Sequence, residues 1–404
     1  MARSIYLRLS IIVSALGFFV DVYDLLLFSI VRKPSLSAIG LNEAQVLSSG
    51  ESLISIQMFG MLIGGIVFGI LGDKKGRLKV LFGSILLYSV ANILNGMVTS
   101  LDLYKILRFI AGIGLAGELG AGVTLVSEQL PAQYRSKAAG LIAGFGVLGA
   151  VFAFFISKLF DWRICYYIGG ILGLFLLIMR LRVKESDLYH QTATANLSRG
   201  NFFMFFNDWN RFSKYIRCIL IGVPVWFVIG VIVTFSDQFG KAFGIEGIHP
   251  GNAIMVFYIG MATGDYFAGW LAESLRSRKK ALWVLEGLFV LFLVLFFTQS
   301  HSNAAYYYFI IGGLGFGAGL NVIYLTLGIE QFGTNLRATA TITISNMVRG
   351  SLPLLILLFK YWRNVVNDYV KGALISAILV MIIAMIATAG VEETYGKDLD
   401  FVEK

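Results

Sequence analysis

The sequence predicts an all-α membrane protein in which twelve transmembrane helices form two similar six-helix bundles. Hydrophobic residues make up 57% of the 404-residue chain and charged residues only 14%, whereas about a quarter of the residues in a typical soluble domain are charged. Apolar stretches of roughly 20 residues, the length that crosses about 30 Å of hydrocarbon, follow one another along the chain. A repeat of short motifs at half the chain length then divides the helices into two halves.

The expected helices lie in two groups of six on either side of a polar central stretch. Their ranges are 9–31, 51–72, 80–100, 103–130, 138–159 and 164–182 in the first group, and 215–239, 251–272, 281–299, 304–331, 339–359 and 368–390 in the second. We therefore expect a first bundle over 1–182, a cytoplasmic linker with an interfacial amphipathic helix over 183–214, and a second bundle with a short tail over 215–404. A regulatory or partner-binding element is the alternative interpretation of the central stretch.

The distribution of charge predicts the orientation in the membrane. The chain has 33 Lys and Arg against 24 Asp and Glu, and the basic residues are concentrated in alternate loops. Because cytoplasmic loops carry an excess of Lys and Arg, we expect a multi-pass inner (plasma) membrane protein with both termini in the cytoplasm. The net charge of +9 is then a topology signal, and no nucleic-acid partner is expected. The first apolar stretch is too long for a signal peptide and is interpreted as a retained helix.

Nothing in the sequence indicates an enzyme. The three histidines fall in expected loops without the spacing of metal ligands, and the two cysteines lie at the starts of successive helices, at opposite membrane faces. The sequence also lacks a nucleophile triad and a phosphate-binding loop. We expect no metal and no cofactor, and a protein that works as a monomer.

A repeat relates the two halves of the chain. EQLPAQYRSKAAG begins at Glu128 and EQFGTNLRATAT begins at Glu330, and in both copies an arginine follows the glutamate by seven residues, at Arg135 and Arg337. The offset between the copies, 330 minus 128 or 202 residues, is half of the 404-residue chain. Two six-helix halves of the same orientation are the simplest account of this repeat.

The stretch GILGDKKGRLKV, residues 69–80, is a charged turn between the second and third expected helices. Asp73 ends one helix, Gly76 permits a tight turn, and Arg77 begins the next helix. A carboxylate here can accept hydrogen bonds from the N-terminus of another helix or from a neighbouring arginine, which makes a contact that opens and closes with conformation. A simple topology signal would need the basic residues but not this spacing. A weaker copy, GWLAE, ends at Glu273.

This pattern resembles the loop between helices two and three of the major facilitator superfamily, G-x3-D-(R/K)-x-G-R. The resemblance implies alternating access, in which two six-helix bundles rock about a central site. It also implies a cytoplasmic latch made of charged residues. The residues that it assigns to gating are Asp73, Gly76, Arg77, Glu128, Arg135, Glu273, Glu330 and Arg337.

Two acids three residues apart, Asp21 and Asp24, lie in the first expected helix. Acids are costly in a bilayer and are kept where they face a cavity or a partner, and at this spacing both point to one side of the helix. Such a buried carboxyl can bind and release a proton during a transport cycle. The alternative is a fixed ion pair with an arginine on another helix.

Arg108 of the fourth expected helix is the candidate partner of Asp24. The two residues lie at similar depths, about 8 Å and about 10 Å from the outer ends of their helices at 1.5 Å per residue. Deprotonated Asp24 would hold Arg108 and protonation would free it, which is a minimal symport switch; a static pair is the alternative. Ten residues on, Glu118 is a second proton site, a substrate contact or a satisfied core acid. The helix has a small-residue face for close packing, formed by Gly112, Gly114, Gly117, Gly120 and Gly122.

These two helices are similar to those of the phosphate:proton symporters and of the related metabolite:proton and organic-anion branches of the superfamily. By this resemblance Asp21 and Asp24 match the acid pair of helix one, Arg108 the arginine of helix four, and Glu118 the acid that follows it. Leu119 stands where the phosphate carriers have a substrate-binding tyrosine. Phosphate itself is therefore not the expected substrate.

Arg349, in the eleventh expected helix, is the candidate substrate ligand of the second half. A cation near the middle of the membrane, where such carriers bind substrate, suits a carboxylate or a phosphate. Its alternative is an ion pair with Asp265, Glu118 or Asp21. Trp226 can contact a substrate by stacking or hydrogen bonding, or simply pack. The remaining candidate substrate contacts are Asp265, Asn321 and Tyr23.

Together these residues predict a proton-coupled symporter that imports a small, anionic organic solute by alternating access. Asp24 and Arg108 would couple the proton, and Arg349 and Trp226 would contact the substrate. The alternatives are a proton antiporter that exports a drug or metabolite and a uniporter of a neutral solute. The expected helix 138–159 lacks the proline of the exporter motif, which favours symport. A sensor or scaffold without turnover would be expected to lack the acids of helix one.

Overall fold

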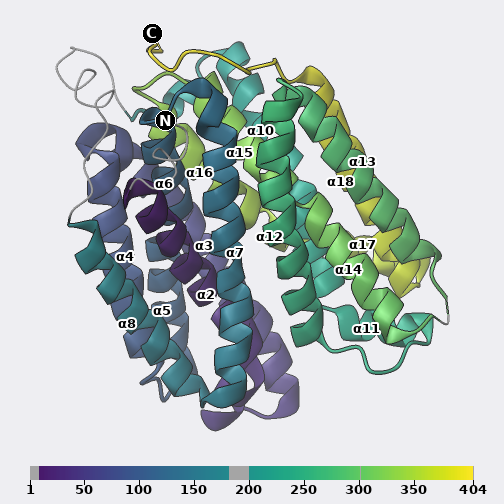
Figure 1. The fold of residues 1–404 in the computed structure, drawn as a ribbon. Coiled ribbons are helices and arrows are strands. Elements are labelled where there is room, and N and C mark those ends of the chain that lie inside the picture. Colours follow the sequence, from purple (N-terminus) through teal and green to yellow (C-terminus); the bar gives the residue numbers. More distant parts are fainter. Residues whose placement is uncertain (1–8, 182–199, 301, 404) are drawn as a thin grey trace.

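The computed structural model describes residues 9–181, 200–300 and 302–403, and these residues are almost entirely helical (Figure 1). The first half contains α2 (Leu9–Ala38), α3 (Glu43–Lys75), α4 (Arg77–Asn95), α5 (Leu101–Leu115), α6 (Glu118–Glu128), the short η1 (Ala132–Tyr134), α7 (Arg135–Leu159) and α8 (Trp162–Arg180). The second half contains η2 (Phe202–Phe205), α10 (Trp209–Phe227), η3 (Val228–Val233), α11 (Ser236–Phe243), α12 (Pro250–Ser274), α13 (Arg278–Thr298), α14 (Ala304–Gly317), α15 (Leu320–Gln331), α16 (Arg337–Gly350), α17 (Leu352–Val366) and α18 (Tyr369–Gly390).

The helices form two groups that stand side by side (Figure 1). Helices α2 to α8, purple to teal, lie on one side and helices α10 to α18 lie on the other. The seam between the groups is made by α7 packed against α12 and by α3 packed against α16. The described chain begins and ends at the top of Figure 1, and we call this side the terminal face and the other side the opposite face.

The helices are those of a multi-pass membrane protein. Eleven helical segments of the described residues are long and apolar enough to cross a membrane. The less apolar α12 has 25 residues, about 37 Å at 1.5 Å per residue, and it packs between α7 and α14. With α12 the described part of the chain has the twelve crossing helices that the sequence predicts.

Several helices begin where a polar side chain accepts a hydrogen bond from the first turn. These N-caps are Asn42, Ser100, Asp161, Asp208, Ser277, Asn303 and Asp368. Such a cap satisfies one of the backbone N–H groups that a helix start leaves without a partner. In contrast, α7 and α16 begin after Tyr134 and Leu336 with no side-chain cap of their own. Both of these helices start at the seam on the terminal face.

Glycines allow the closest helix contacts, as the small-residue face predicted for residues 103–130 requires. A Cβ on Gly112 would lie 2.2 Å from the backbone oxygen of Gln57 in α3, and a Cβ on Gly120 would lie 2.6 Å from the Cα of Ile342 in α16. These distances leave no room for a side chain, so the backbones themselves are in contact. The first contact lies inside one half, and the second joins the two halves.

The structure differs from the expected ranges in several places. The expected helices 103–130, 304–331 and 339–359 are each interrupted, between α5 and α6, between α14 and α15 and between α16 and α17. Helix α2 ends later than expected, at Ala38, and α3 begins earlier, at Glu43. The expected helix 215–239 begins earlier, at Trp209, and becomes the π-helical η3 after Pro224, which has no N–H to give to the helix. Of the expected linker and interfacial helix over 183–214, residues 183–199 lie outside the described residues, and the aromatic part that follows forms the short η2 and the start of α10.

Candidate functional site

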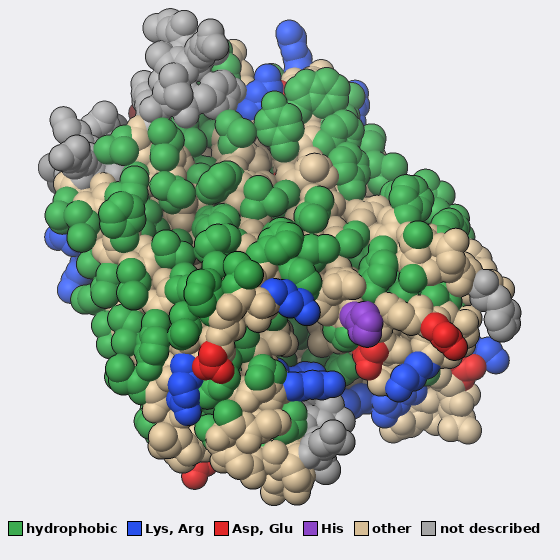
Figure 2. Space-filling view, turned by 60° about the horizontal axis from the view of Figure 1, so that its bottom comes forward, with side chains coloured by type: hydrophobic (Ala, Val, Ile, Leu, Met, Phe, Trp, Pro, Cys, Tyr) green, Lys and Arg blue, Asp and Glu red, His purple; other side chains and the backbone are tan. Residues whose placement is uncertain are grey.

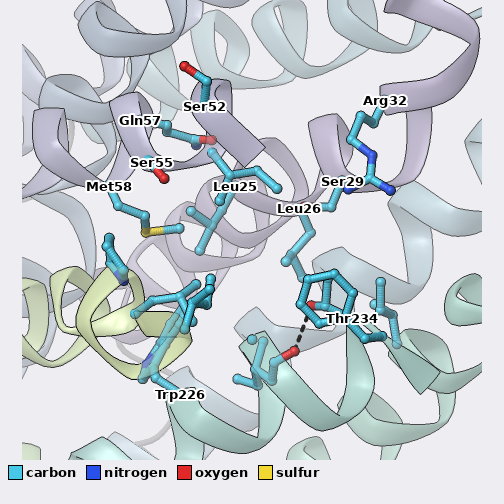
Figure 3. Close-up of a pocket in the computed structure, with 18 of the residues that line it drawn as sticks. Leu25, Leu26, Ser29, Arg32, Ser52, Ser55, Gln57, Met58, Trp226 and Thr234 are labelled. Atoms are coloured by element: carbon cyan, nitrogen blue, oxygen red, sulfur yellow. Dashed lines mark hydrogen bonds between the residues drawn. The ribbon is translucent and has the colours of Figure 1, made fainter. Parts of the chain in front are cut away.

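A cavity of about 370 Å³ lies between the two halves. Its walls come from α2 and α3 of the first half and from α10, η3, α12 and α17 of the second. The lining residues are Leu25, Leu26, Ser29, Arg32, Ser52, Ile54, Ser55, Gln57, Met58, Trp226, Ile229, Gly230, Thr234, Phe235, Ile254, Tyr258, Leu352, Pro353, Ile356, Leu357 and Lys360. Figure 3 shows Leu25 and Met58 of the first half across the cavity from Trp226 of the second half. The wall is mostly apolar with a few polar groups, which is typical of a small-molecule site.

The cavity lies toward the opposite face. Helix α2 runs from the terminal face to the opposite face and contributes its second half, from Leu25 to Arg32. Helix α3 runs back and contributes an early stretch, from Ser52 to Met58. Figure 2, which brings the opposite face forward, shows Lys and Arg side chains around a hollow between the halves. The site is therefore approached from the opposite face.

Two cations, Arg32 of α2 and Lys360 of α17, belong to the cavity wall, and none of the described lining residues is an acid. The sequence analysis did not select either of them, because each lies near the outer end of its helix, where a basic residue is usually a topology signal. Trp226, which the sequence analysis did select, lies in the wall and is 7% exposed.

The other predicted substrate contacts lie outside this wall. The hydroxyl of Tyr23 donates to the backbone oxygen of Cys165 at 2.8 Å, so this side chain points toward α8. Asn321 lies in α15 and is 5% exposed, and Asp265 is fully buried in α12. Arg349 lies in the last turn of α16, three residues before Leu352 of the wall.

Arg349 forms an ion pair with Asp21 that joins the two halves. The distance between Nη1 of Arg349 and Oδ2 of Asp21 is 3.6 Å, and both side chains are almost fully buried. The guanidinium also lies over the ring of Phe18, 5.9 Å from its centroid. Neither residue lines the cavity, but Asp21 lies one helical turn before Leu25 of its wall, so the pair lies beside the cavity on the side of the terminal face. It realises one of the alternatives that the sequence left open for Arg349.

Asp24 and Arg108 do not form the ion pair that we expected from their depths. Arg108 donates to the side-chain oxygen of Gln57 and lies over the ring of Phe28 at 5.0 Å. Both carboxyl oxygens of Asp24 lack a hydrogen-bond partner among the described residues, although the side chain is fully buried. Similar depth does not ensure contact, because the rotation of each helix about its axis decides which side chains meet.

Glu118 is satisfied within the first half. It forms two hydrogen bonds with Arg180 at the end of α8, one of them 3.0 Å long, and Arg180 also donates to the backbone oxygen of Leu81 at 3.2 Å. A Cβ on Gly17 would collide with both side chains of this pair. Arg180 was not predicted as a site residue, because it falls near the end of an expected helix, where a basic residue is usually a topology signal.

On the terminal face, Asp73 of α3 caps the first turn of α16 in the other half. Its carboxylate accepts from the backbone N–H of Ala338 at 3.0 Å, the backbone N–H of Thr339 at 2.8 Å and the hydroxyl of Thr339 at 2.7 Å. Arg77 lies 3.4 Å from the same carboxylate. The sequence pattern predicts that Asp73 can bind the N-terminus of another helix. In the structure this is the N-terminus of α16, whose own residues provide no side-chain cap.

Glu128 is shared by arginines from both halves. Its Oε1 accepts from Arg77 at 2.8 Å and from Arg337 at 3.0 Å, and Arg77 also donates to the backbone oxygen of Thr334 at 3.1 Å. All three charged side chains are buried. We call the contacts made by Asp73, Arg77, Glu128 and Arg337 the terminal latch. They hold the two halves together at the terminal face.

The repeat places a related set of charges in the second half. Glu330 accepts from Arg278 at 3.0 Å and Arg278 also pairs with Glu273 at 3.1 Å, as Glu128 and Asp73 surround Arg77 in the first half. Arg135, the counterpart of Arg337, donates instead to the backbone oxygen of Lys397 at 2.9 Å. The two sets are therefore similar in composition but differ in the partner of the second arginine.

The C-terminal segment covers the latch. The backbone oxygen of Leu399 accepts from Arg337 at 2.6 Å, and the hydroxyl of Thr394 donates to Glu330 at 2.7 Å. Glu393 accepts from the hydroxyl of Ser277 and from the backbone N–H of Arg278 at 2.9 Å at the start of α13. Burial acts to raise the pKa of Glu393, but these hydrogen bonds outweigh it and hold the pKa below the ordinary value of 4.5.

Two helical halves around a cavity that is reached from one face and latched at the other define a membrane transporter rather than an enzyme. The chain belongs to the Major Facilitator Superfamily, whose family model matches residues 7–356. This confirms the superfamily and the fold that the sequence predicts.

Comparison with individual proteins agrees with this assignment. The chain is 28% identical over 411 residues to a putative metabolite transport protein of Haemophilus influenzae, and the match covers 97% of each chain. It is 26% identical over 345 residues to the cis,cis-muconate transport protein of Acinetobacter baylyi, with 82% of each chain covered. Its fold is similar to that of the proton:xylose symporter XylE, with a TM-score of 0.75, 17% identity and 98% of each chain covered. The chain thus matches transport proteins of the same superfamily along most of its length.

Proposed function

We propose that the protein is a proton-coupled symporter that imports a small organic anion across an inner membrane, with both termini in the cytoplasm. The observation that carries this proposal is the ion pair between Asp21 and Arg349, 3.6 Å apart, which joins the two halves one helical turn from the cavity wall. In this orientation the terminal face is cytoplasmic and the cavity is open to the outside.

The substrate class follows from the charges around the cavity. Arg32 and Lys360 belong to its wall, and Arg349 lies three residues before Leu352 of the wall. A carboxylate can accept two parallel hydrogen bonds from one arginine. Each of these charge-assisted bonds is stronger than a hydrogen bond between neutral groups. Trp226 provides an apolar surface for the remainder of the molecule. A relative that is a muconate transport protein supports an anionic substrate.

Proton coupling follows from competition for Arg349. A substrate carboxylate that binds Arg349 displaces Asp21, and a buried carboxylate without a partner is strongly unfavourable. Asp21 therefore takes up a proton as the anion binds. When the terminal face opens, the anion leaves to water, the proton leaves Asp21, and the Asp21–Arg349 pair forms again. Anion and proton then travel together in the same direction.

Asp24 is the intermediate proton site in this scheme. It lies one helical turn from Asp21 on the same side of α2, and neither of its oxygens has a hydrogen-bond partner among the described residues. It can thus receive a proton from the cavity side and pass it to Asp21. Arg108, held by Gln57 and Phe28, takes no direct part in the transfer.

The test is uptake into proteoliposomes under an imposed pH gradient, with a panel of mono- and dicarboxylates, phosphate, sugars and amino acids. We expect one or more carboxylates to be accumulated by the wild type and by Asp102→Asn, an exposed control. Asp21→Asn should still exchange the accepted substrate across the membrane but should no longer accumulate it with the gradient. Accumulation by Asp21→Asn equal to that of the wild type would refute the coupling scheme, and uptake of neutral solutes alone would refute the substrate class.

A further inference from the structure

Asp265 lies in the seam where α7 of the first half packs against α12 of the second, and its carboxyl has no hydrogen-bond partner among the described residues. The side chain is 0% exposed, and neither oxygen has a hydrogen bond among the described residues. A Cβ on Gly140 of α7 would lie 2.7 Å from the backbone oxygen of Asp265, and a Cβ on Gly144 would lie 3.6 Å from the Cβ of Asp265. Helix α7 of the first half thus passes directly over this acid of the second half.

The groups around Asp265 offer it no cation. The titratable side chains in electrostatic reach are Tyr258 on its own helix and Tyr324 on α15. Arg349 of α16 acts on the same two tyrosines, but its ion pair is with Asp21. Of the neighbouring helices, α7 contributes only glycines to the contacts around Asp265 described above. Helix α14 contributes Phe316, which lies against Gly264. One turn further toward the terminal face, Gly269 of α12 lies against the backbone of Ser136 and Lys137, and Glu273 follows with its own partner, Arg278.

A carboxylate in this position would be buried without any compensating contact, and such a charge strongly opposes the packing around it. The unfavourable contact exists only while α7 and α12 touch. Separation of these helices at the terminal face would admit water to Asp265, and water stabilises the charged form. The protonation state of Asp265 and the closure of the terminal face are therefore linked.

We propose that Asp265 is a proton-binding residue that sets the pH dependence of terminal-face opening. It is neutral while α7 and α12 are packed together, and it releases its proton to water on the terminal side when they separate. Because the proton is released and taken up on the same side, Asp265 does not add to the protons that are transported. This assignment rests on the alternating access and proton coupling proposed above, and it replaces the predicted role of Asp265 as a substrate contact.

The test measures the distance between α7 and α12 as a function of pH. Leu141 and Trp270 line one surface groove between these helices, so spin labels on Leu141→Cys and Trp270→Cys report opening, in full-length protein in nanodiscs with Cys165 and Cys218 replaced by serine. We expect the ratio of open to closed protein to rise with pH. One linked proton changes the ratio of open to closed protein by up to about tenfold per pH unit. In Asp265→Asn this contribution should be lost, so the ratio should rise less steeply with pH. Asp265→Ala, which introduces no amide, should behave in the same way, and Asp102→Asn should match the wild type.

A second measurement separates this inference from the proposed function. The ratio of protons to substrate in proteoliposomes should be the same for Asp265→Asn and the wild type, and it should fall for Asp21→Asn. An unchanged pH dependence of opening in both Asp265 variants would overturn the role of Asp265 and leave the symport scheme intact. A lower proton ratio in Asp265→Asn would also overturn it, because Asp265 would then carry a transported proton. An unchanged ratio in Asp21→Asn would instead refute the proposed coupling.

Discussion

Asp73 of α3 accepts two hydrogen bonds from Thr339 of α16, one from the backbone N–H at 2.8 Å and one from the hydroxyl at 2.7 Å. The two residues belong to different halves and are 266 positions apart in the sequence. A single carboxylate thus joins the halves and also caps a helix. This contact can exist only while the terminal face is closed.

Replacement of Asp73 should favour opening of the terminal face. The Asp73→Asn amide keeps one acceptor but loses the charge that binds the start of α16. Charged hydrogen bonds of this kind contribute roughly 1.5–3 kcal/mol each, so the ratio of open to closed protein should rise about tenfold or more. Distances between spin labels on α3 and α16 at the terminal face would measure this shift. A closed population equal to that of the exposed control Asp102→Asn would contradict a latch role.

Glu128→Gln should lower the stability of the protein as well as open the latch. Arg77 and Arg337 both donate to Oε1 of Glu128 and are buried, so the change leaves two guanidinium groups without their carboxylate. Breaking a buried pair in this way costs about 3–5 kcal/mol. Thermal unfolding in detergent should show a clear fall in the midpoint, whereas Glu246→Gln, at an exposed position, should have little effect.

The C-terminal segment should detach on acidification. The pKa of Glu393 is lower in the folded protein than its ordinary value of 4.5, so its contribution to docking is complete above that ordinary value and is lost as the pH falls through the lower folded pKa. A spin label on Asp400→Cys should become mobile in that acidic range. In Glu393→Gln it should be mobile at every pH. Glu392→Gln is the matched control, because Glu392 is largely exposed and pairs only with Lys214 at 3.4 Å.

Gly112→Ala should separate α5 from α3 and impair both stability and transport. The added Cβ would lie 2.2 Å from the backbone oxygen of Gln57, so one helix has to move, and overpacking of this kind typically costs about 1–3 kcal/mol. The movement also displaces Gln57 from Arg108. Gly287→Ala in α13 has no neighbouring atom within 4 Å and should be tolerated. Unfolding midpoints and uptake rates that are equal for the two variants would argue against close packing at Gly112.

The sequence predicts the latch better than the cavity, and the reason is physical. Asp73 and Arg77 lie in a turn whose spacing fixes their geometry, and their partners follow from the general preference of a helix N-terminus for a carboxylate. The cavity depends on how each helix is rotated about its own axis. Depth alone could bring Arg108 near Asp24, but the structure turns Arg108 toward Gln57 and brings Arg349 to Asp21 instead.

Three charged residues of the structure's interior were not predicted from the sequence because of their position along their helices. Arg32, Lys360 and Arg180 lie near helix ends, where basic residues usually report topology. Two of them belong to the cavity wall and the third holds Glu118. A sequence pattern cannot separate a charge that faces lipid headgroups from one that turns inward, because both occur at the same distance from the helix centre.

Helix α16 has no cap from its own sequence and takes one from Asp73 in the other half. Each opening of the terminal face must therefore leave the amides of Ala338 and Thr339 without their acceptor and expose them to water. Their hydrogen–deuterium exchange should be fast whenever the carrier cycles and slow whenever it rests. Two backbone amides at the terminal face thus report transport turnovers in a protein that carries no added label.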